Sequence, residues 1–526
     1  MSGIAAHHLA RYQSAMKDID EKIEEATQLL EALVEDRTLL VGIEEEKRNR
    51  FLMAAGRVSR PGKHKRRALA KARQRKRKKD KRQADQELLD NTGIREEREN
   101  PIFQTPRRLE AFHGKGEVAG RRLLDGPKSR GDDETVETSS PIGQTTEERD
   151  CYVCGKTFRD VHFFYDQMCL ECGDFNYAKR FQTADLTGRV ALVTGSRVKI
   201  GYQAAILLLR AGAKVICTTR FPNDAAQRYA AEEDFDQWGD RLEIYGLDFR
   251  HTPSVEGFCR QLRRTLPRLD FIINNACQTV RRPAGFYDHL MEKELSSDEL
   301  TEEQKKLVGQ ITDMETDDDQ GLAHPEAPAA LLSQVELLEE DKERGHHLFP
   351  KGQLDADLQQ VDLRKVNSWR LKLDEVSAVE LLEVHLVNTV APFIINARLK
   401  PLMTAVPTKD KHIVNVSAME GQFYRIFKTD RHPHTNMAKA ALNMMTRTSA
   451  ADYVEDGIHM NSVDTGWVTD EDPVHHADKK REIHDFHPPL DIVDGAARIV
   501  DPILHGINTG EHVWGQFLKD YQVTDW

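Results

Sequence analysis

The feature that most constrains the fold is a regular alternation of short apolar segments and longer amphipathic ones between residue 188 and the C-terminus. The apolar segments are bounded by turns and rich in β-branched residues, which is typical of buried strands, whereas residues 202–213 repeat with the period of a helix. Six strands are expected, at 189–195, 214–220, 242–248, 270–276, 411–418 and 457–466. Because strands separated by helices favour parallel pairing through crossovers, the sequence predicts an α/β fold with a doubly wound parallel sheet.

The composition places the chain outside several classes of protein. It has 526 residues, of which 31% are charged, and a mean hydropathy of −0.61. No run of about 18 apolar residues is apparent, so no membrane-spanning helix is expected. The N-terminus lacks the apolar core of a secretory signal, and seven cysteines are too few for a disulfide framework. These properties predict a soluble cytoplasmic or nuclear protein without a membrane partner.

The net charge of −12 conceals two strongly charged blocks of opposite sign. Residues 57–82 carry 15 Lys and Arg with one acid, and residues 288–344 carry 18 Asp and Glu with 5 Lys and Arg. The basic block lacks aromatic side chains that stack on bases. It is therefore a solvated charged run, a nuclear-import signal or a contact with nucleic acid or an acidic protein. The acidic block, an insert at about 288–345, is expected to be a flexible surface loop.

The N-terminal third of the chain divides into a helical part and a basic linker. Residues 1–56 are expected to be helical, because apolar residues recur at alternating spacings of three and four between residues 16 and 40. This pattern fits a coiled coil, and it fits equally a single amphipathic helix packed on its own protein. Residues 57–150 combine the basic block with a polar, flexible linker.

Residues 151–182 contain the motif C-x2-C, fourteen residues, C-x2-C. The four cysteines are Cys151, Cys154, Cys169 and Cys172. Two such pairs of thiolates complete a tetrahedral shell around Zn²⁺, and four sulfur ligands leave no position for a water molecule. The motif therefore predicts a structural zinc knuckle, with a redox dithiol or metal-free reduced cysteines as the alternatives.

The first predicted strand leads into TGSRVKIG (194–201), a glycine-containing turn that opens a helix. Such a turn lets backbone amides approach the pyrophosphate of a dinucleotide at the helix N-terminus. Asp248 closes the third predicted strand, at a position suited to bonding an adenine, and NNA (274–276) closes the fourth. The second strand ends in Arg220 and not in an acid, so Arg220 either binds a ribose 2′-phosphate or simply faces solvent.

These motifs resemble those of the short-chain dehydrogenase/reductase family, over residues 187–526 apart from the insert. The resemblance also rests on NNAC (274–277), VNTVAPF (387–393), IVNVSA (413–418), a lysine at 439 and VDTGWVTD (463–470). It implies a Rossmann-like domain that binds NADP(H), which in the family usually accompanies an arginine at the end of the second strand. The cofactor-binding residues that it implies are Thr194, Gly195, Arg197, Lys199, Ile200, Gly201, Arg220, Asp248, Asn275, Ala276, Lys439 and Gly466.

The predicted catalytic residues depart from those of the family, which uses a Tyr-x3-Lys pair, a serine and an asparagine. Lys439 and Asn388 match the lysine and the asparagine, but Thr435 stands at the tyrosine position, and Ser417 lies one residue before the serine position. A threonine hydroxyl cannot replace a phenol as a proton donor, so Tyr424 in the preceding loop is a further candidate. The other candidates in this loop are Glu420, His432 and His434.

Two functions are compatible with these residues. The first is an NADP(H)-dependent oxidoreductase that acts on a carbonyl, alcohol or enoyl substrate with non-standard proton donors. The alternative is a catalytically inactive NADP(H)-binding scaffold or sensor whose zinc knuckle and basic arm bind a protein or nucleic acid. A homo-oligomer is expected, because family members pair through helices that correspond to residues 377–403 and 434–456. Arg281 and Arg282 either face an anionic ligand as part of a lid or have a purely structural role.

Overall fold

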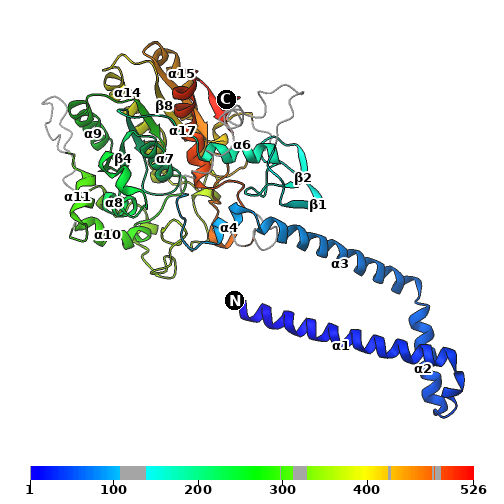
Figure 1. Cartoon of the computed structure of the whole chain (residues 1–526). Helices are drawn as coiled ribbons and strands as arrows, with labels where there is room; N and C mark the ends of the chain where they lie inside the picture. Colours follow the sequence, from blue (N-terminus) through cyan, green and yellow to red (C-terminus); the bar gives the residue numbers. More distant parts are fainter. Residues whose placement is uncertain are drawn as a thin grey trace. The chain divides into compact units, whose positions relative to one another are not determined.

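The structure, a computed structural model, describes residues 2–106, 138–296, 298–311, 328–424, 428–476, 479 and 487–526, with side chains from residue 18 onward. The chain divides into two compact units, Met1–Gln83 and Ala84–Trp526. Figure 1 shows the long helices of the first unit in dark blue. The second unit carries the sheet and the motifs singled out in the sequence, and we call it the catalytic unit after the catalytic residues that the sequence predicts in it.

The first unit consists of helices joined by short turns, as the apolar periodicity predicts. Its elements are α1 (Ser2–Glu35), the 3-10 turn η1 (Arg37–Leu40), α2 (Glu45–Ser59) and part of α3 (Lys63–Asp90). Ile19, Ile23 and Leu30 occupy heptad positions on α1, and each remains at least 40% exposed. The basic block lies mainly on α3, where residues 62–84 are all exposed. This unit therefore displays its charges and most of its apolar stripe at the surface.

The catalytic unit contains a nine-stranded sheet, which confirms the predicted doubly wound α/β fold. The strand order is β11-β10-β9-β8-β6-β3-β4-β5-β7, and every neighbouring pair is parallel except β10 and β11. The six predicted strands are β3 (Val190–Thr194), β4 (Lys214–Thr219), β5 (Leu242–Gly246), β6 (Phe271–Asn274), β8 (Lys411–Ser417) and β9 (Ile458–Asp464). The unpredicted strands, at the two edges of the sheet and next to one of them, are β7 (Val308–Gly309), β10 (Phe517–Lys519) and β11 (Gln522–Thr524). These strands have two or three residues, too few to show an alternating pattern.

Helices cover both faces of this sheet and bury two hydrophobic clusters against it. The helices that contribute to the first cluster are α7 (Lys199–Arg210), α8 (Pro222–Ala230) and α17 (Ile492–Thr509). The helices that contribute to the second are α9 (Thr252–Thr265), α14 (Ala391–Met403) and α15 (Pro433–Glu455). Figure 1 shows α7 and α17 next to each other on one side of the sheet. Alternate residues of β8 point to opposite faces, so Asn415 and Ser417 lie on the side of α14 and α15.

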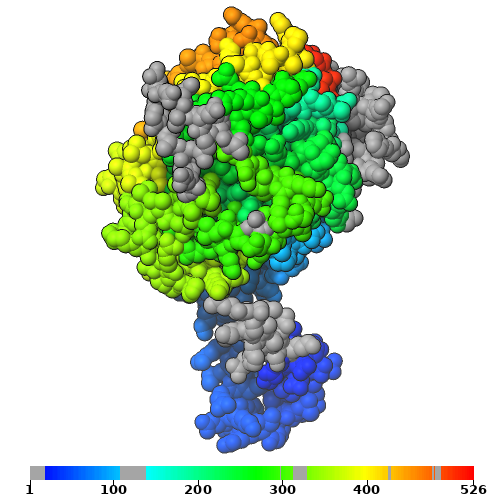
Figure 2. Space-filling view, turned by 90° about the vertical axis from the view of Figure 1, so that its left-hand side faces the viewer, coloured from blue at the N-terminus to red at the C-terminus, as the bar shows by residue number. Residues whose placement is uncertain are grey.

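The acidic insert is packed against the sheet where the structure describes it, which departs from the surface loop that the sequence predicts. Its elements are η5 (Ala284–Tyr287), α10 (Asp288–Leu295), α11 (Glu302–Leu307), β7, α12 (Ala329–Leu332) and η6 (Glu339–Lys342). Phe286, Tyr287 and Phe349 pack with Phe221 in a hydrophobic cluster of their own. Figure 2 shows this part of the chain, in green to yellow-green, as a continuous surface. The apolar anchors are widely spaced between charges, which conceals them in the sequence.

The four cysteines belong to a small subdomain at the other side of the catalytic unit. Its elements are α4 (Gly93–Glu99), β1 (Gly143–Asp150), β2 (Thr157–Val161) and α6 (Leu170–Arg180), and we call it the cysteine subdomain. Leu89 and Ile94 are buried here, so residues 84–106 do not behave as the expected linker. Figure 1 shows α6, in cyan, beside α17.

Within the helical stretch Ala378–Met403, an 18-residue window has a mean hydropathy of 1.5, and the stretch is long and apolar enough to cross a membrane. Core helices of globular proteins pass the same test, so the expectation of no membrane-spanning helix stays a prediction. The stretch comprises α13 (Ala378–His385), a π-helical turn η8 (Leu386–Val390) and α14. It packs against α9 and α15 within the catalytic unit. Of its apolar 18-residue window, 39% is buried within the protein.

Candidate functional site

The turn after β3 is held against the end of β6 by contacts that require small residues. A Cβ atom on Gly195, whose φ is +64°, would lie 2.7 Å from the Cα of Ala276. The Thr194 hydroxyl accepts a hydrogen bond from the Ala276 amide at 3.0 Å. The Asn275 side chain donates to the carbonyl oxygens of Thr194 and Gly195, both at 3.0 Å. Four of the predicted cofactor-binding residues thus form one rigid turn at the carboxyl edge of the sheet.

The second half of the turn begins α7 and brings Gly201 against the same residues. A Cβ atom on Gly201 would lie 2.4 Å from the Gly195 carbonyl oxygen, so only glycine fits. Lys199 has a φ of +57°, in the left-handed region that a lysine rarely occupies. Burial alone would lower the pKa of Lys199, but the carboxylates of Glu471, Asp357 and Asp355 outweigh it and raise that pKa. Strained backbone of this kind is more frequent at functional sites, in keeping with the cofactor-binding role that the sequence predicts for this turn.

Three of the charged residues predicted to bind the cofactor have protein partners. Arg197 bonds Asp224 at 2.7 Å. Arg220 donates to the Tyr287 hydroxyl at 2.6 Å and stacks over that ring, 4.6 Å from its centre. The Asp248 carboxylate accepts from the guanidinium of Arg250 at 2.7 Å. Burial would raise the pKa of Asp248, but the Arg250 interactions outweigh it, so that pKa is lowered.

Helix α15 carries a polar face at the carboxyl end of β8. Residues Thr435, Lys439 and Asn443 follow one another at intervals of four, and all three are buried. The Lys439 ammonium group donates to the Val416 carbonyl at 2.8 Å. Ser417 is the last residue of β8 and is 3% exposed. The structure therefore brings Lys439, Ser417 and Thr435 to the end of the sheet at which a dinucleotide binds in this fold.

Asn388 lies in the π-helical turn η8, between α13 and α14. Its side-chain oxygen accepts a hydrogen bond from the Gln278 amide at 2.7 Å, which ties it to the chain leaving β6. A π-helical turn inside an α-helix is frequent at functional sites, because it re-aims one residue of the helix. Asn388 is thus held beside the segment that follows the cofactor strand.

Several buried polar atoms at this end of the sheet have no hydrogen-bond partner among the described residues. They are Ser417 Oγ, Thr435 Oγ1, both ring nitrogens of His434 and both side-chain polar atoms of Asn443. A buried polar group without a partner costs about 1–3 kcal/mol, so such groups are rare unless a ligand satisfies them. Their concentration here indicates a surface prepared for a polar ligand.

Family models match two parts of this region: short chain dehydrogenase over residues 189–297, and enoyl-(acyl carrier protein) reductase over residues 367–489. The chain belongs to the short-chain dehydrogenase/reductase family.

Curated and solved relatives of this short-chain dehydrogenase/reductase differ in how much of it they share. The chain is 30% identical over 373 residues to the uncharacterized protein R665 of Acanthamoeba polyphaga mimivirus, covering 68% of this chain and 71% of that protein. It is 31% identical over 109 residues to 2-dehydro-3-deoxy-D-gluconate 5-dehydrogenase of Pseudoalteromonas atlantica, covering 20% of this chain and 42% of that enzyme. A Burkholderia cenocepacia short chain dehydrogenase solved with NADP is 17% identical, with a TM-score of 0.40, and covers 64% of this chain and 97% of that one. The match to the named dehydrogenase thus spans less than half of that enzyme.

The candidate proton donors of this short-chain dehydrogenase/reductase, in and next to the loop before α15, differ widely in exposure and in the residues they contact. Tyr424 is 97% exposed, so its phenol lies at the surface and is not among the buried polar groups. His432 stacks on Trp369 with ring centres 3.9 Å apart. His434 is 1% exposed, and its Nε2 lies 3.3 Å from Oε1 of Glu380 on α13. Sequence reasoning missed Glu380, which no motif signals, and Asn443, which the four-residue spacing from Lys439 could have indicated.

The four motif cysteines lie together, with all their sulfur atoms within 4.8 Å of one another. The sulfur atoms of Cys154 and Cys169 are 3.8 Å apart. Four thiolates at Zn–S distances of about 2.3 Å would stand just under 4 Å apart in a tetrahedral shell. Contacts with Cys169 and Cys172 lower the pKa of the Cys151 thiol, as expected where thiols crowd around one another. The arrangement fits a zinc ion.

Arg281 and Arg282 at the start of the insert bind carboxylates of the protein itself. Arg281 bonds Asp341 through two nitrogens, each at 2.7 Å, and Glu383 at 2.9 Å. Arg282 bonds Asp362. These contacts attach the insert to the domain, and they favour the structural interpretation of the two arginines over a role in binding an anionic ligand.

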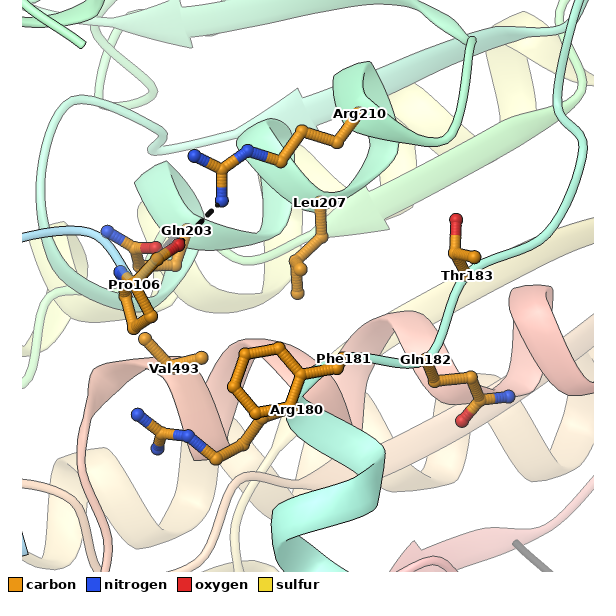
Figure 3. A pocket seen from close by; sticks show the side chains of 9 residues that line it. All are labelled: Pro106, Arg180, Phe181, Gln182, Thr183, Gln203, Leu207, Arg210 and Val493. Atoms are coloured by element: carbon orange, nitrogen blue, oxygen red, sulfur yellow. Dashed lines mark hydrogen bonds between the residues drawn. The ribbon is translucent and has the colours of Figure 1, made fainter. Parts of the chain in front are cut away.

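A surface pocket lies away from this site, between the end of α6, α7 and the start of α17 (Figure 3). In the close-up, Arg210 donates to the Pro106 carbonyl across the pocket at 3.0 Å. The residues that line it are Pro106, Arg180, Phe181, Gln182, Thr183, Gln203, Leu207, Arg210 and Val493. None of them belongs to the predicted site, so this pocket marks a seam between the cysteine subdomain and the sheet.

Proposed function

We propose that the protein is an NADP(H)-dependent oxidoreductase that acts on a carbonyl, alcohol or enoyl substrate with a proton donor other than tyrosine. The observation that carries the proposal is the set of buried, unpartnered polar atoms beside Lys439 at the carboxyl end of β8. The bound cofactor would supply or accept the hydride. Lys439 would bind the nicotinamide ribose, as its family counterpart does, and the Ser417 hydroxyl would bind the substrate oxygen.

We further propose that His434 donates the proton in place of the missing tyrosine. Its Nε2 lies 3.3 Å from Glu380 Oε1, within ion-pair distance, and neither ring nitrogen makes a hydrogen bond among the described residues. A carboxylate beside one ring nitrogen orients the imidazole, so the other nitrogen can exchange a proton with a ligand. In a carbonyl reduction the carbon would gain the hydride and the oxygen would gain this proton, which gives the alcohol. Exposed Tyr424 and the weakly acidic hydroxyl of Thr435 are poorer donors.

The preference for NADP(H) over NAD(H) rests on the end of β4. Thr218, Thr219 and Arg220 offer no carboxylate to a ribose 2′-hydroxyl, and the guanidinium of Arg220 is held flat against Tyr287. A planar guanidinium pairs well with a phosphate. A fluorescence titration should give tighter binding of NADPH than of NADH, and Arg220→Ala should remove the difference. The control is Arg398→Ala, which removes an exposed arginine paired with Glu256.

Turnover is tested by following NADPH absorbance with a panel of carbonyl and enoyl compounds. Lys439→Ala should weaken NADPH binding, whereas His434→Gln should lower kcat by about 10²–10⁴-fold with little change in NADPH affinity. Thr448→Ala, which alters an exposed residue of the same helix outside the proposed interface residues, is the control. NADPH binding without consumption across the whole panel would favour the alternative, a catalytically inactive NADP(H)-binding scaffold or sensor.

We propose that Cys151, Cys154, Cys169 and Cys172 bind a structural zinc ion, because their sulfur atoms converge within the spacing of a tetrahedral site. Metal analysis of protein purified under reducing conditions should give one zinc per chain. A variant with Cys154→Ser and Cys169→Ser should lose it, whereas Cys277→Ser, which changes an exposed cysteine outside the motif, should keep it. A metal-free protein whose cysteines form disulfides would support the redox alternative.

A second function is proposed for the first unit, namely binding of RNA or DNA through residues 57–82. The supporting observation is that the cations of α3 between residues 63 and 82 are all exposed along one helix. Helical rise is about 1.5 Å per residue, so these charges are spaced nearly as densely as the phosphates of a duplex. Binding should weaken steeply with salt for homopolymer and mixed sequences alike. Salt-insensitive or absent binding would leave an acidic protein as the partner.

We also propose that the protein forms a homo-oligomer through α13, α14 and α15. Leu382, Phe393, Met437 and Met444 on these helices are each more than half exposed, which is unusual for large apolar residues unless a partner covers them. Light scattering of the full chain should give at least a dimer, and Phe393→Asp with Met444→Asp should give a monomer.

A further inference from the structure

The cysteine subdomain holds both ends of the chain segment that connects β9 to α17. Tyr152, next to the ligand Cys151, accepts a hydrogen bond from the Trp467 amide at 2.9 Å. Gln167, two residues before the ligand Cys169, donates to the His487 carbonyl at 2.8 Å. The Tyr152 amide in turn donates to the Gln167 carbonyl at 2.9 Å, so the two knuckles are tied together. Trp467 and His487 are thus attached to the backbone that carries the four cysteines.

A shared hydrophobic cluster makes the same connection. Buried Cys151 and Cys172 belong to one cluster with Val468 and Leu490, which flank the connecting segment. Ile200 of the cofactor turn also packs against this cluster. The cysteine subdomain therefore has no core of its own that is separate from the catalytic unit.

A polar network fixes the start of α17 in the same way. Arg180 of α6 bonds both oxygens of Asp491 at 2.7 Å, and the Tyr165 hydroxyl bonds Asp494 at 2.5 Å. The Cys172 carbonyl accepts from Asn176, whose side-chain oxygen accepts from Arg498 at 2.7 Å. A displaced Cys172 would therefore disturb the first two turns of α17.

The residues held in this way adjoin the proposed active site. Asp464, the last residue of β9, pairs with Ser417 in the sheet register and accepts from the Met419 amide at 3.2 Å. Gly466, one of the predicted cofactor-binding residues, follows directly, and a Cβ atom there would lie 3.1 Å from the Tyr152 hydroxyl. The chain from residue 464 to 468 has the active site at its beginning and the cysteine subdomain at its end.

We propose that metal binding by the four cysteines positions residues 464–468 and 487–494, and through them sets the affinity of the active site for its substrate and cofactor. The metal ion is then a positioning element for the oxidoreductase reaction and not the centre of an independent docking module. This inference rests on the proposed oxidoreductase function only where catalysis is the readout. A tetrahedral metal site fixes the backbone at four positions at once. The hydrogen bonds of Tyr152 and Gln167 then restrict the motion of Trp467 and His487 in the connecting segment.

Hydrogen exchange in the full chain tests the proposal without requiring turnover. Zinc is removed with a chelator under reducing conditions and then restored with zinc chloride. Peptides that cover 464–468 and 487–494 should exchange faster in the metal-free protein and return to their original rates with zinc. Peptides that cover β4 and β5, on the far side of the sheet order, should not change. Unchanged exchange at 464–468 and 487–494, or equal acceleration throughout the unit, would overturn the proposal.

A variant that keeps all four cysteines covers the case in which the metal-free protein does not fold. Tyr152→Phe should retain zinc but speed exchange of the Trp467 amide about fivefold, the effect of losing one ordinary hydrogen bond. The apparent KM should rise while kcat changes less, and NADPH affinity should fall. Tyr245→Phe is the matched control, because it removes a hydroxyl bonded to Glu243 on β5. If no compound of the panel is turned over, the proposed oxidoreductase function fails. The rates of hydrogen exchange and the NADPH affinity still test the positioning role of the metal site in that case. Wild-type exchange and affinity in Tyr152→Phe would refute it.

Discussion

The two units of the chain use positive charge in opposite ways. In the first unit, the cations of α3 are exposed and spread around the helix. In the catalytic unit, Arg180, Arg281 and Arg498 are almost completely buried, and each bonds at least one carboxylate. A buried guanidinium is tolerated only when carboxylates and carbonyls satisfy it, so these arginines serve the fold. The charges of the first unit are therefore exposed to solvent, as the proposed binding of nucleic acid requires, whereas those of the catalytic unit hold its own insert and cysteine subdomain in place.

The largest effect is expected from removing a buried arginine. Arg180→Ala leaves the carboxylates of Asp491 and Asp494 buried without their cation, which should destabilise the catalytic unit by about 3–5 kcal/mol. Chemical denaturation of the full chain, followed by tryptophan fluorescence, measures this loss. Lys71→Ala on α3 is the matched control and should change stability by less than about 0.5 kcal/mol. Equal effects of the two substitutions would abolish the distinction between the units.

The doubly wound sheet was predictable because its central strands are long, apolar and bounded by turns, so their period survives in the sequence. The cysteine spacing likewise predicted that four sulfur atoms converge. The insert was not predictable, since the partners that fix it, such as Asp341 for Arg281, are 60 residues away in the chain. The same holds for Glu380, whose relation to His434 depends on how α13 packs against α15. Tyr424 could not be placed because a loop tyrosine has no periodic signal of burial.

Asp464 extends the comparison of the two units, because it is a buried carboxylate that no guanidinium bonds among the described residues. Burial raises the pKa of Asp464 to about 6, since Lys519 only partly offsets it and Glu420 and Asp520 add to it. Between the unfolded value near 3.8 and about 6, the folded protein keeps a proton that the unfolded chain has released. The free energy of unfolding should therefore fall as pH rises through this window. Asp464→Asn should remove that part of the pH dependence and raise stability at pH 7 by at most roughly 3 kcal/mol.

Asp341 gives the opposite sign and serves as the control for Asp464. Burial alone would raise the pKa of Asp341, but its hydrogen bonds from Arg281 outweigh burial and lower that pKa. Its contribution to stability is present above the unfolded value and is lost as pH falls through the folded one. Asp341→Asn should therefore destabilise the protein at pH 7. Denaturation curves from pH 4 to 8 for both variants check the two signs, and parallel behaviour of the variants would contradict the assignment.

Removing charge from α3 should affect partner binding and leave folding intact. A variant with Arg75, Lys76, Arg77 and Lys78 changed to glutamine should lower the slope of log affinity against log salt by roughly 3 to 4 on duplex nucleic acid. That corresponds to about a hundredfold change over a fourfold range of salt. Fluorescence anisotropy measures the slope, and denaturation of the catalytic unit should match wild type. An unchanged slope would place the nucleic-acid contact outside this stretch.

The smallest effect tests whether charge pairs within the first unit matter for its folding. Lys22 bonds Asp18 one turn away on α1 at 2.7 Å, and both side chains are at least 60% exposed. Such a pair stabilises a helix by only about 0.3–0.5 kcal/mol, because water and salt screen it. Lys22→Ala should therefore leave the helical circular dichroism of the full chain nearly unchanged, and high salt should have the same slight effect on wild type. A loss above about 1 kcal/mol would mean that this surface is covered by a partner, which the exposed Ile19 and Ile23 beside it would then help to form.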